Sequence, residues 1–168
     1  MKFNKGEHVL YSKTGVCLID DIRTCEFLNK DQLYYILKPV SSKGSTVYVP
    51  VDSALTDDMH PIVTVEEIDT LLTASKDKEI KWIEPKGDRA EYFNSIISES
   101  DRQKLILLIR CIYMKKQEKQ LEKKHLSATD DAILKTAEKL IDEEFSFAIG
   151  CSESKVGEYI RAKLGMNE

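Results

Sequence analysis

The chain has 168 residues, which is enough for one ordinary domain or two small ones. Hydrophobic residues make up 42% of it and charged residues 32%, as is typical of a soluble globular protein. The longest apolar run, residues 105–109, is too short to span a bilayer, and the N-terminus lacks the apolar core of a signal peptide. We therefore predict a cytoplasmic protein with no membrane partner.

The formal net charge is −4, but the charges are unevenly distributed along the chain. Residues 101–125 hold eight Lys/Arg and three Asp/Glu, a local net charge of +5. Residues 61–100 and residues 126–168 each hold five Lys/Arg and nine Asp/Glu, a net charge of −4 in each case. One basic segment inside an acidic chain is either the solvated face of a helix or a surface for a polyanion.

The first sixty residues are predicted to form short β-strands. Runs rich in Val, Ile, Leu and Tyr cover residues 8–12, 15–22, 33–40 and 45–51. Turn-forming residues separate these runs at 13–15, 29–31 and 41–44. Such spacing favours a small, strongly bent sheet or partial barrel, and Pro50 places the last run at an edge of it.

From residue 62 onward the apolar residues follow the helical period. Four capping residues mark the predicted helix starts: Thr64, Ser100, Ser127 and Ser152. Gly150 is a predicted helix stop. The sequence thus predicts an α+β protein, in which a β module at residues 1–60 is followed by an all-α bundle at residues 61–168.

Reactive side chains do not converge on a recognisable catalytic or metal site. The histidines lie in three different regions, and the four cysteines have no paired spacing. The sequence contains no nucleotide-binding glycine motif and no nucleophile motif. We expect buried, reduced cysteines, no metal, no cofactor and no small-molecule substrate. These features favour a binding protein, and a small enzyme is the least favoured of the alternatives.

The only tryptophan, Trp82, lies in a charged connector at residues 78–89 that is broken by Pro85 and Gly87. One explanation is that the indole packs against the bundle and anchors the following helix. The other is that it acts as a wedge, since minor-groove proteins press an apolar side chain against an opened base step while nearby basic residues neutralise phosphates.

Basic residues around the connector fit the wedge explanation. Lys81 stands before Trp82, and Lys86 and Arg89 follow it. The basic segment ends at Lys123 and Lys124, which are candidates to hold a DNA backbone nearby. Lys86, Arg89, Lys123 and Lys124 are therefore predicted to contact DNA together with Trp82.

Several stretches, taken in order, resemble the CarD/CdnL family of bacterial transcription regulators. FNKGEHVLYSKTGVCLIDDI is similar to the N-terminal signature of that family, whose first module is shared with transcription-repair coupling factors. YYILKPV and STVYVPVDSA resemble the next strand pair of the module. WIEPKGDRAEYFNSIISESD, LIRCIYMKKQEKQ and LSATDDAILKTAEKLIDEEFSFAIG resemble the helical domain of the family.

This resemblance implies a Tudor-like module that docks on the RNA polymerase β subunit, partly by strand pairing. It implies a helical domain that contacts promoter DNA at the upstream edge of the transcription bubble, with the wedge tryptophan of the family at Trp82. The polymerase-contacting arginines of well-studied relatives match Cys25 and Tyr48 in this sequence. The predicted polymerase contact therefore includes these two residues and the neighbouring Arg23 and Val47.

The function implied by the resemblance is transcription regulation without enzymatic activity. The protein would regulate transcription by prolonging the lifetime of the promoter open complex. We expect a monomeric protein associated with the nucleoid, with the polymerase β subunit and promoter DNA as its partners. A protein-only adaptor, with two protein-interaction modules and a buried Trp82, is the alternative.

Overall fold

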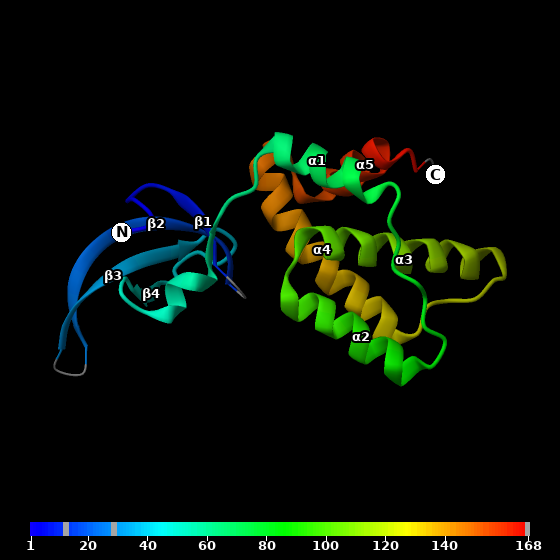
Figure 1. Ribbon diagram of the computed structural model, residues 1–168, viewed down its shortest axis with the longest axis horizontal. Coiled ribbons are helices and arrows are strands. Elements are labelled where there is room, and N and C mark those ends of the chain that lie inside the picture. The colour runs from blue at the N-terminus through cyan, green and yellow to red at the C-terminus, as the bar shows by residue number, and fades with distance from the viewer. Residues whose placement is uncertain (12–13, 28–29, 167–168) are drawn as a thin grey trace. The chain divides into compact units, whose positions relative to one another are not determined.

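The computed structural model describes residues 1–11, 14–27 and 30–166. Lys13 and Asn29 of two predicted turns, and Ser12 of a predicted strand, therefore lie outside the described residues. The chain forms two compact units, Met1–Val63 and Thr64–Glu168. A sheet precedes a set of helices (Figure 1), and the predicted α+β class is confirmed. The first unit ends after Val63 rather than after residue 60, because strand β5 (Met59–Pro61) pairs with the sheet.

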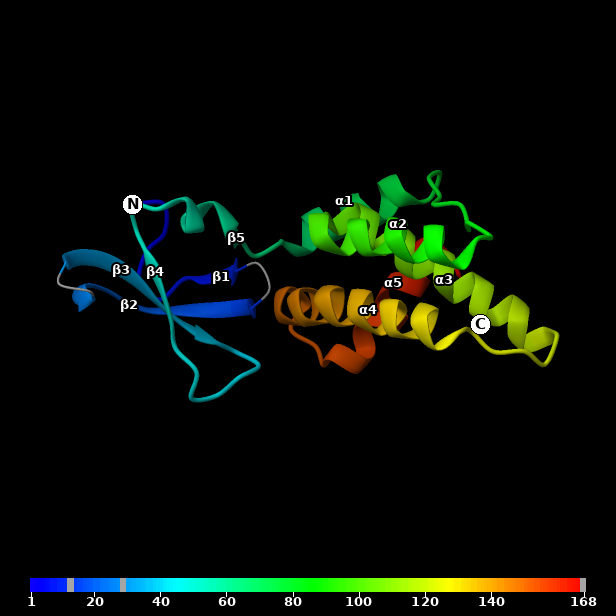
Figure 2. The same cartoon turned by 90° about the horizontal axis from the view of Figure 1, so that it is seen from below.

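All pairings within the described part of the sheet are antiparallel, in the order β4-β3-β2-β1-β5. The remaining strands are β1 (His8–Tyr11), β2 (Gly15–Phe27), β3 (Lys30–Pro39) and β4 (Val47–Pro50). Strands β2 and β3 form a long curved pair (Figures 1 and 2) that reaches beyond the predicted strands. Strand β4 lies at one end of the order, which confirms the predicted edge position of Pro50.

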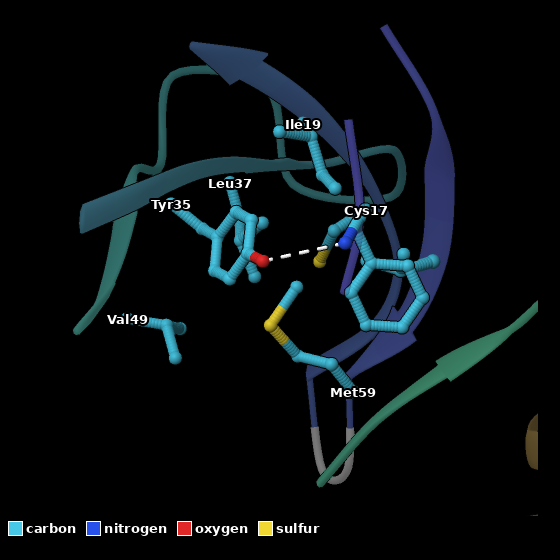
Figure 3. Packing of buried hydrophobic residues seen from close by; sticks show 8 residues of the cluster. Cys17, Ile19, Tyr35, Leu37, Val49 and Met59 are labelled. Carbon is cyan, nitrogen blue, oxygen red and sulfur yellow. Dashed lines mark hydrogen bonds between the residues drawn. The ribbon is translucent and has the colours of Figure 1, made fainter. Parts of the chain in front are cut away.

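One face of this sheet packs a small apolar core (Figure 3). Tyr35 and Leu37 of β3 meet Cys17 and Ile19 of β2 there, together with Met59 of β5. The Tyr35 hydroxyl accepts a hydrogen bond from the Phe3 amide at 3.3 Å (Figure 3), which satisfies a buried donor. Burial of each large apolar side chain contributes about 1.5–3 kcal/mol, so this cluster holds the sheet together.

The second unit contains five helices in its described part. Their bounds are α1 (Val65–Ser75), α2 (Lys86–Glu99), α3 (Arg102–Leu121), α4 (Ala128–Ile149) and α5 (Glu153–Leu164). Helix α3 packs against α1, α2 and α4, and α5 covers parts of α1 and α4 (Figures 1 and 2). The interior is apolar and includes Leu108 and Ile112 of α3 and Ile141 and Phe145 of α4.

Most of the predicted helix ends are confirmed, because capping depends on nearby residues. Thr64 forms a capping box with Glu67, Ser127 caps α4, Ser152 precedes α5, and Gly150 ends α4 with a left-handed φ of 80°. The predicted start at Ser100 is wrong. Ser100 is the left-handed C-cap of α2, and Asp101 caps α3 by accepting a hydrogen bond from the Lys104 amide at 2.9 Å.

All four cysteines are free thiols, as expected for reduced cysteines. Only Cys17 is buried, whereas Cys25, Cys111 and Cys151 are half-buried, so the expectation of burial is correct for one of them. Cys17 fills part of the apolar core of the sheet, which accounts for its burial.

A small cavity of about 70 Å³ lies between α3, α4 and α5. Ile106, Leu164 and other apolar residues line it, together with the carboxyl groups of Glu138 and Asp142. Burial, and then the nearby carboxylates of Glu138 and Glu153, raise the pKa of Asp142 to about 7. Arg110 and Arg161 also line the cavity, so that both signs of charge surround its apolar floor.

The raised pKa of Asp142 predicts a pH-dependent stability. The ionised carboxylate costs stability above about pH 7, and this cost disappears as the pH falls toward the unfolded-state pKa of about 3.9. At pH 8, Asp142→Asn is expected to raise the free energy of unfolding by about 1–2 kcal/mol, a modest gain because the Asp142 side chain is only partly buried. At pH 4, the same substitution should give no gain in stability. Chemical denaturation of the full chain at both pH values measures this difference. An equal effect at both would contradict it.

Candidate functional site

Trp82 lies in the connector between α1 and α2 and is half-buried against the helical unit. Its ring meets the Phe93 ring edge to face, with centroids 6.0 Å apart. The guanidinium carbon of Arg89 lies 4.3 Å from the indole ring centroid, and the Lys115 Nζ lies 5.5 Å from it. The indole is therefore anchored on the bundle and also flanked by two cations, which combines features of both explanations for its position.

Arg89 is almost completely buried, with 6% of its side chain exposed. Its Nε and Nη2 atoms donate hydrogen bonds to the two carboxylate oxygens of Asp130, at 2.9 Å and 2.8 Å. Its Nη1 atom donates to the carbonyl oxygens of Ile83 and Glu84 in the connector, at 2.8 Å and 3.0 Å. The prediction that Arg89 contacts a phosphate is thereby corrected, because each guanidinium nitrogen already binds a protein oxygen inside the unit.

Asp130 lies in the first turn of α4 and is buried, with 1% of its side chain exposed. The Ser127 hydroxyl donates to its carboxylate at 2.7 Å and accepts from its backbone amide at 3.1 Å. Burial acts to raise the pKa of Asp130, but the hydrogen bonds from Arg89 and Ser127 outweigh it and hold that pKa below its ordinary value. Asp130 is therefore a charged acceptor that joins the start of α4 to α2.

The predicted lysines are exposed and lie at helix ends. Lys86 is the first residue of α2, and Lys123 and Lys124 come after Glu122, the C-cap of α3. The Lys124 amide donates to the Lys119 carbonyl at 2.8 Å, and the Lys123 amide to the Gln120 carbonyl at 3.0 Å. Lys123 has a left-handed φ of 58°, at a position where helix ends of this type favour glycine. A lysine with this backbone conformation costs stability, so the Lys123 side chain is a candidate for a functional role.

An open groove of about 820 Å³ lies between the connector and α3. Trp82 and Met114 form part of its wall. Its charged lining is basic on balance, with five basic residues (Lys76, Lys78, Lys81, Arg110 and Lys115) and three acidic ones (Asp77, Glu79 and Glu118). Figures 1 and 2 show that the connector, the start of α2 and the loop between α3 and α4 lie at one end of the helical unit. Sequence reasoning missed Lys115, because spacing along α3 does not reveal which lysine meets the indole.

Two exposed aromatic rings and one buried ring, that of Tyr34, gather on the β unit, on the face of the sheet opposite its core. Phe27 and Tyr48 are 43% and 41% exposed, and Tyr34 lies between them in the sheet. The ring centroids of Phe27 lie 5.2 Å from those of both Tyr34 and Tyr48, in edge-to-face contacts. We refer to Phe27, Tyr34 and Tyr48 as the aromatic patch. The prediction included only Tyr48 of these three.

The other predicted docking residues lie around this patch in different ways. Arg23 pairs with Tyr34 in the strand register and is exposed, so it lies on the same face. A hydrogen bond with the Cys25 side chain raises the pKa of Arg23, and Asp21 lies 4.0 Å away. Val47 is different. Its side chain is half-buried and packs against the apolar core, while its backbone lies on the edge strand β4.

Comparison with known proteins identifies the unit that carries this patch. Residues 3–63 match the family described as the CarD-like/TRCF RID domain. The match covers nearly the whole N-terminal unit, to which we refer as the CarD-like unit. The chain is also 22% identical over 154 residues to "Putative transcription factor YdeB" of Bacillus subtilis (strain 168), across 92% of this chain and 97% of the relative. The CarD/CdnL resemblance predicted from the sequence is thereby confirmed.

The CarD-like unit and the relative both point to a transcription factor rather than to an enzyme. In the described part of the chain, the His, Cys, Asp and Glu side chains form no group that could hold a metal ion. No helix within residues 1–11, 14–27 and 30–166 is long and apolar enough to cross a membrane.

Proposed function

We propose that this protein is a transcription regulator that docks on the RNA polymerase β subunit and stabilises the promoter open complex. The CarD-like family of residues 3–63 supports the polymerase-interacting role. The observation that carries the DNA-directed role is Trp82, a half-buried indole flanked by cations beside a basic groove. An aromatic ring next to cationic side chains is the combination that unstacked bases and their phosphates bind.

The proposed docking uses the edge strand and the aromatic patch of the CarD-like unit together. Strand β4 ends the strand order, so its outer backbone groups are available for an added strand from the partner. The patch supplies apolar area, and Arg23 supplies a charge for a carboxylate. Exposed aromatic residues of this kind are enriched among the residues that dominate binding energy at interfaces.

Tyr48→Asp and Phe27→Ala are expected to weaken binding to the isolated β subunit by about tenfold or more, since each removes apolar area from the patch. Leu55→Ala is the control, because Leu55 is 48% exposed and lies on the short 3-10 helix η2 (Ala54–Asp58) of the same unit. Affinity can be measured as binding of the full-length variants to the immobilised β subunit. Wild-type affinity in both patch variants would place the interface elsewhere.

In the proposed DNA contact, the polymerase brings the helical unit to the promoter. The net charge of −4 opposes free binding to DNA, so affinity is expected to be weak without polymerase. Tethering through the CarD-like unit raises the effective concentration of the helical unit at the upstream fork. There Trp82 meets an opened base step, and Lys86, Lys115, Lys123 and Lys124 neutralise phosphates.

Lys123→Gly is expected to weaken DNA binding while it stabilises the fold. Glycine adopts the left-handed φ of residue 123 without steric cost, so the melting temperature should rise by the equivalent of about 1 kcal/mol. Loss of one phosphate contact should reduce the slope of log affinity against log salt by roughly 0.9. Lys155→Ala, at an exposed position of α5, is the control for charge alone. An unchanged slope would assign Lys123 to the solvated surface.

A further inference from the structure

We propose that the buried Arg89–Asp130 pair is a positioning latch, which fixes the connector backbone at Trp82 and so sets the lifetime of the open complex without touching DNA. This inference rests on the proposed function, in which Trp82 is the group that meets DNA. It assigns Arg89 and Asp130, two residues of opposite charge, to one role.

The geometry of the latch joins separate segments of the chain through one side chain. Asp130, at the start of α4, holds the guanidinium of Arg89 from one side at 2.8–2.9 Å. The same guanidinium holds the carbonyls of Ile83 and Glu84 and lies 4.3 Å from the centroid of the Trp82 ring. Because Ile83 directly follows Trp82, a fixed Ile83 carbonyl also fixes the backbone from which the indole projects.

Stability alone gives no reason for an ion pair at this place. Apolar side chains of the same volume stabilise a protein interior as well as, or better than, a buried ion pair. A guanidinium is the only side-chain group that can bind both oxygens of a carboxylate and two further carbonyls at once, because it presents a planar fork of donors. The function of Arg89 is therefore the geometry that it imposes on the connector.

A second buried pair in the same unit provides a matched control. Arg102, in the first turn of α3, donates to both carboxylate oxygens of Glu144 on α4. Glu144 has 2% of its side chain exposed and Arg102 30%, compared with 6% for Arg89, so the control pair has the same chemistry and an equally buried carboxylate but a more exposed guanidinium. Arg102 lies about 20 Å along α3 from Lys115, at ~1.5 Å per residue, and is therefore remote from the indole.

The experiment compares Arg89→Lys, Asp130→Asn and the control Arg102→Lys in the full-length protein. Two readouts are used: acrylamide quenching of Trp82 fluorescence in the free protein, and the lifetime of open complexes challenged with competitor. Both latch variants are expected to make Trp82 more accessible to quencher. They should shorten the lifetime by about fivefold or more, since the two hydrogen bonds to the connector are each worth roughly two- to tenfold.

The signs of the charges separate positioning from direct contact. Arg89→Lys keeps the positive charge, so a direct phosphate contact predicts a nearly wild-type lifetime. Asp130→Asn removes a negative charge near DNA, so electrostatics alone predicts a longer lifetime. A shorter lifetime in both variants, with wild-type behaviour of Arg102→Lys, supports the latch. A wild-type or longer lifetime in either latch variant overturns it.

The double variant Arg89→Met/Asp130→Leu keeps the proposal testable if the single variants unfold. Its apolar side chains fill the volume of the pair, so its melting temperature should stay near that of the wild type, while quenching rises and the lifetime falls. Wild-type quenching and lifetime in this variant would overturn the latch. Trp82→Ala in the same lifetime assay tests the proposed function separately, because an unchanged lifetime in this variant rejects the DNA role of Trp82. The quenching data on the latch variants still decide whether Arg89 and Asp130 position the indole.

Discussion

Replacing Trp82 with alanine is expected to shorten the lifetime of the open complex by roughly five- to a hundredfold. Stacking of an aromatic side chain on an unstacked base is worth about 1–3 kcal/mol, and about 1.4 kcal/mol corresponds to a factor of ten in an equilibrium or a rate. Polymerase binding should be unaffected, because the proposed docking surface belongs to the other unit. The measurement is a competitor-challenged lifetime, and the protein-only adaptor alternative predicts no change in it.

The position of Trp82 also sets how much stability this variant loses. The indole is half-buried and contacts Phe93 and Arg89, so its truncation is expected to cost about 1–2 kcal/mol, compared with about 3–5 kcal/mol for a fully buried large aromatic residue. Tyr92→Ala is the matched control, because Tyr92 is a 43% exposed aromatic residue of α2 that also neighbours Phe93. A large drop in melting temperature, or a lifetime equal to that of Tyr92→Ala, would make Trp82 a purely structural residue.

Arg89→Ala is expected to lower the free energy of unfolding by about 3–5 kcal/mol at pH 7, because it leaves the buried Asp130 carboxylate without its cation. Chemical denaturation of the full-length protein measures this loss. Lys135→Ala is the control, since Lys135 pairs with Asp131 at 2.8 Å on the surface and such pairs contribute less than about 1 kcal/mol. A loss for Arg89→Ala no larger than that of the control would contradict the buried-pair description.

The pH dependence of this loss follows from the lowered pKa of Asp130. A carboxyl group whose pKa is lower in the folded state adds stability above its unfolded pKa of about 3.9, and this stability is lost as the pH falls through the folded pKa. The difference between wild type and Arg89→Ala is therefore expected to be largest near neutral pH and to narrow below about pH 4. A difference that stays constant down to pH 3 would mean that ionisation of Asp130 is not its source.

Local chemistry made part of the fold predictable. Thr64 and Ser127 were predicted to start helices, and both do, because a capping side chain binds a backbone amide only three residues away. The start predicted at Ser100 fails for an equally local reason, since Asp101 offers a competing carboxylate one residue later. The strand runs were found from their apolar residues. The outer part of the β2–β3 pair was missed because polar residues such as Thr24 and Glu26 give no apolar alternation.

The candidate site was predictable only in its outline. The sequence by itself determined the α+β class and the CarD-like character of the first unit, because these depend on residue type and order. Only the tertiary structure decided that Arg89 faces inward, since its partner Asp130 is 41 residues away in the chain. It also decided that Val47 packs in the core while Tyr48 joins the aromatic patch, because strand register, which depends on long-range pairing, assigns neighbouring residues to opposite faces.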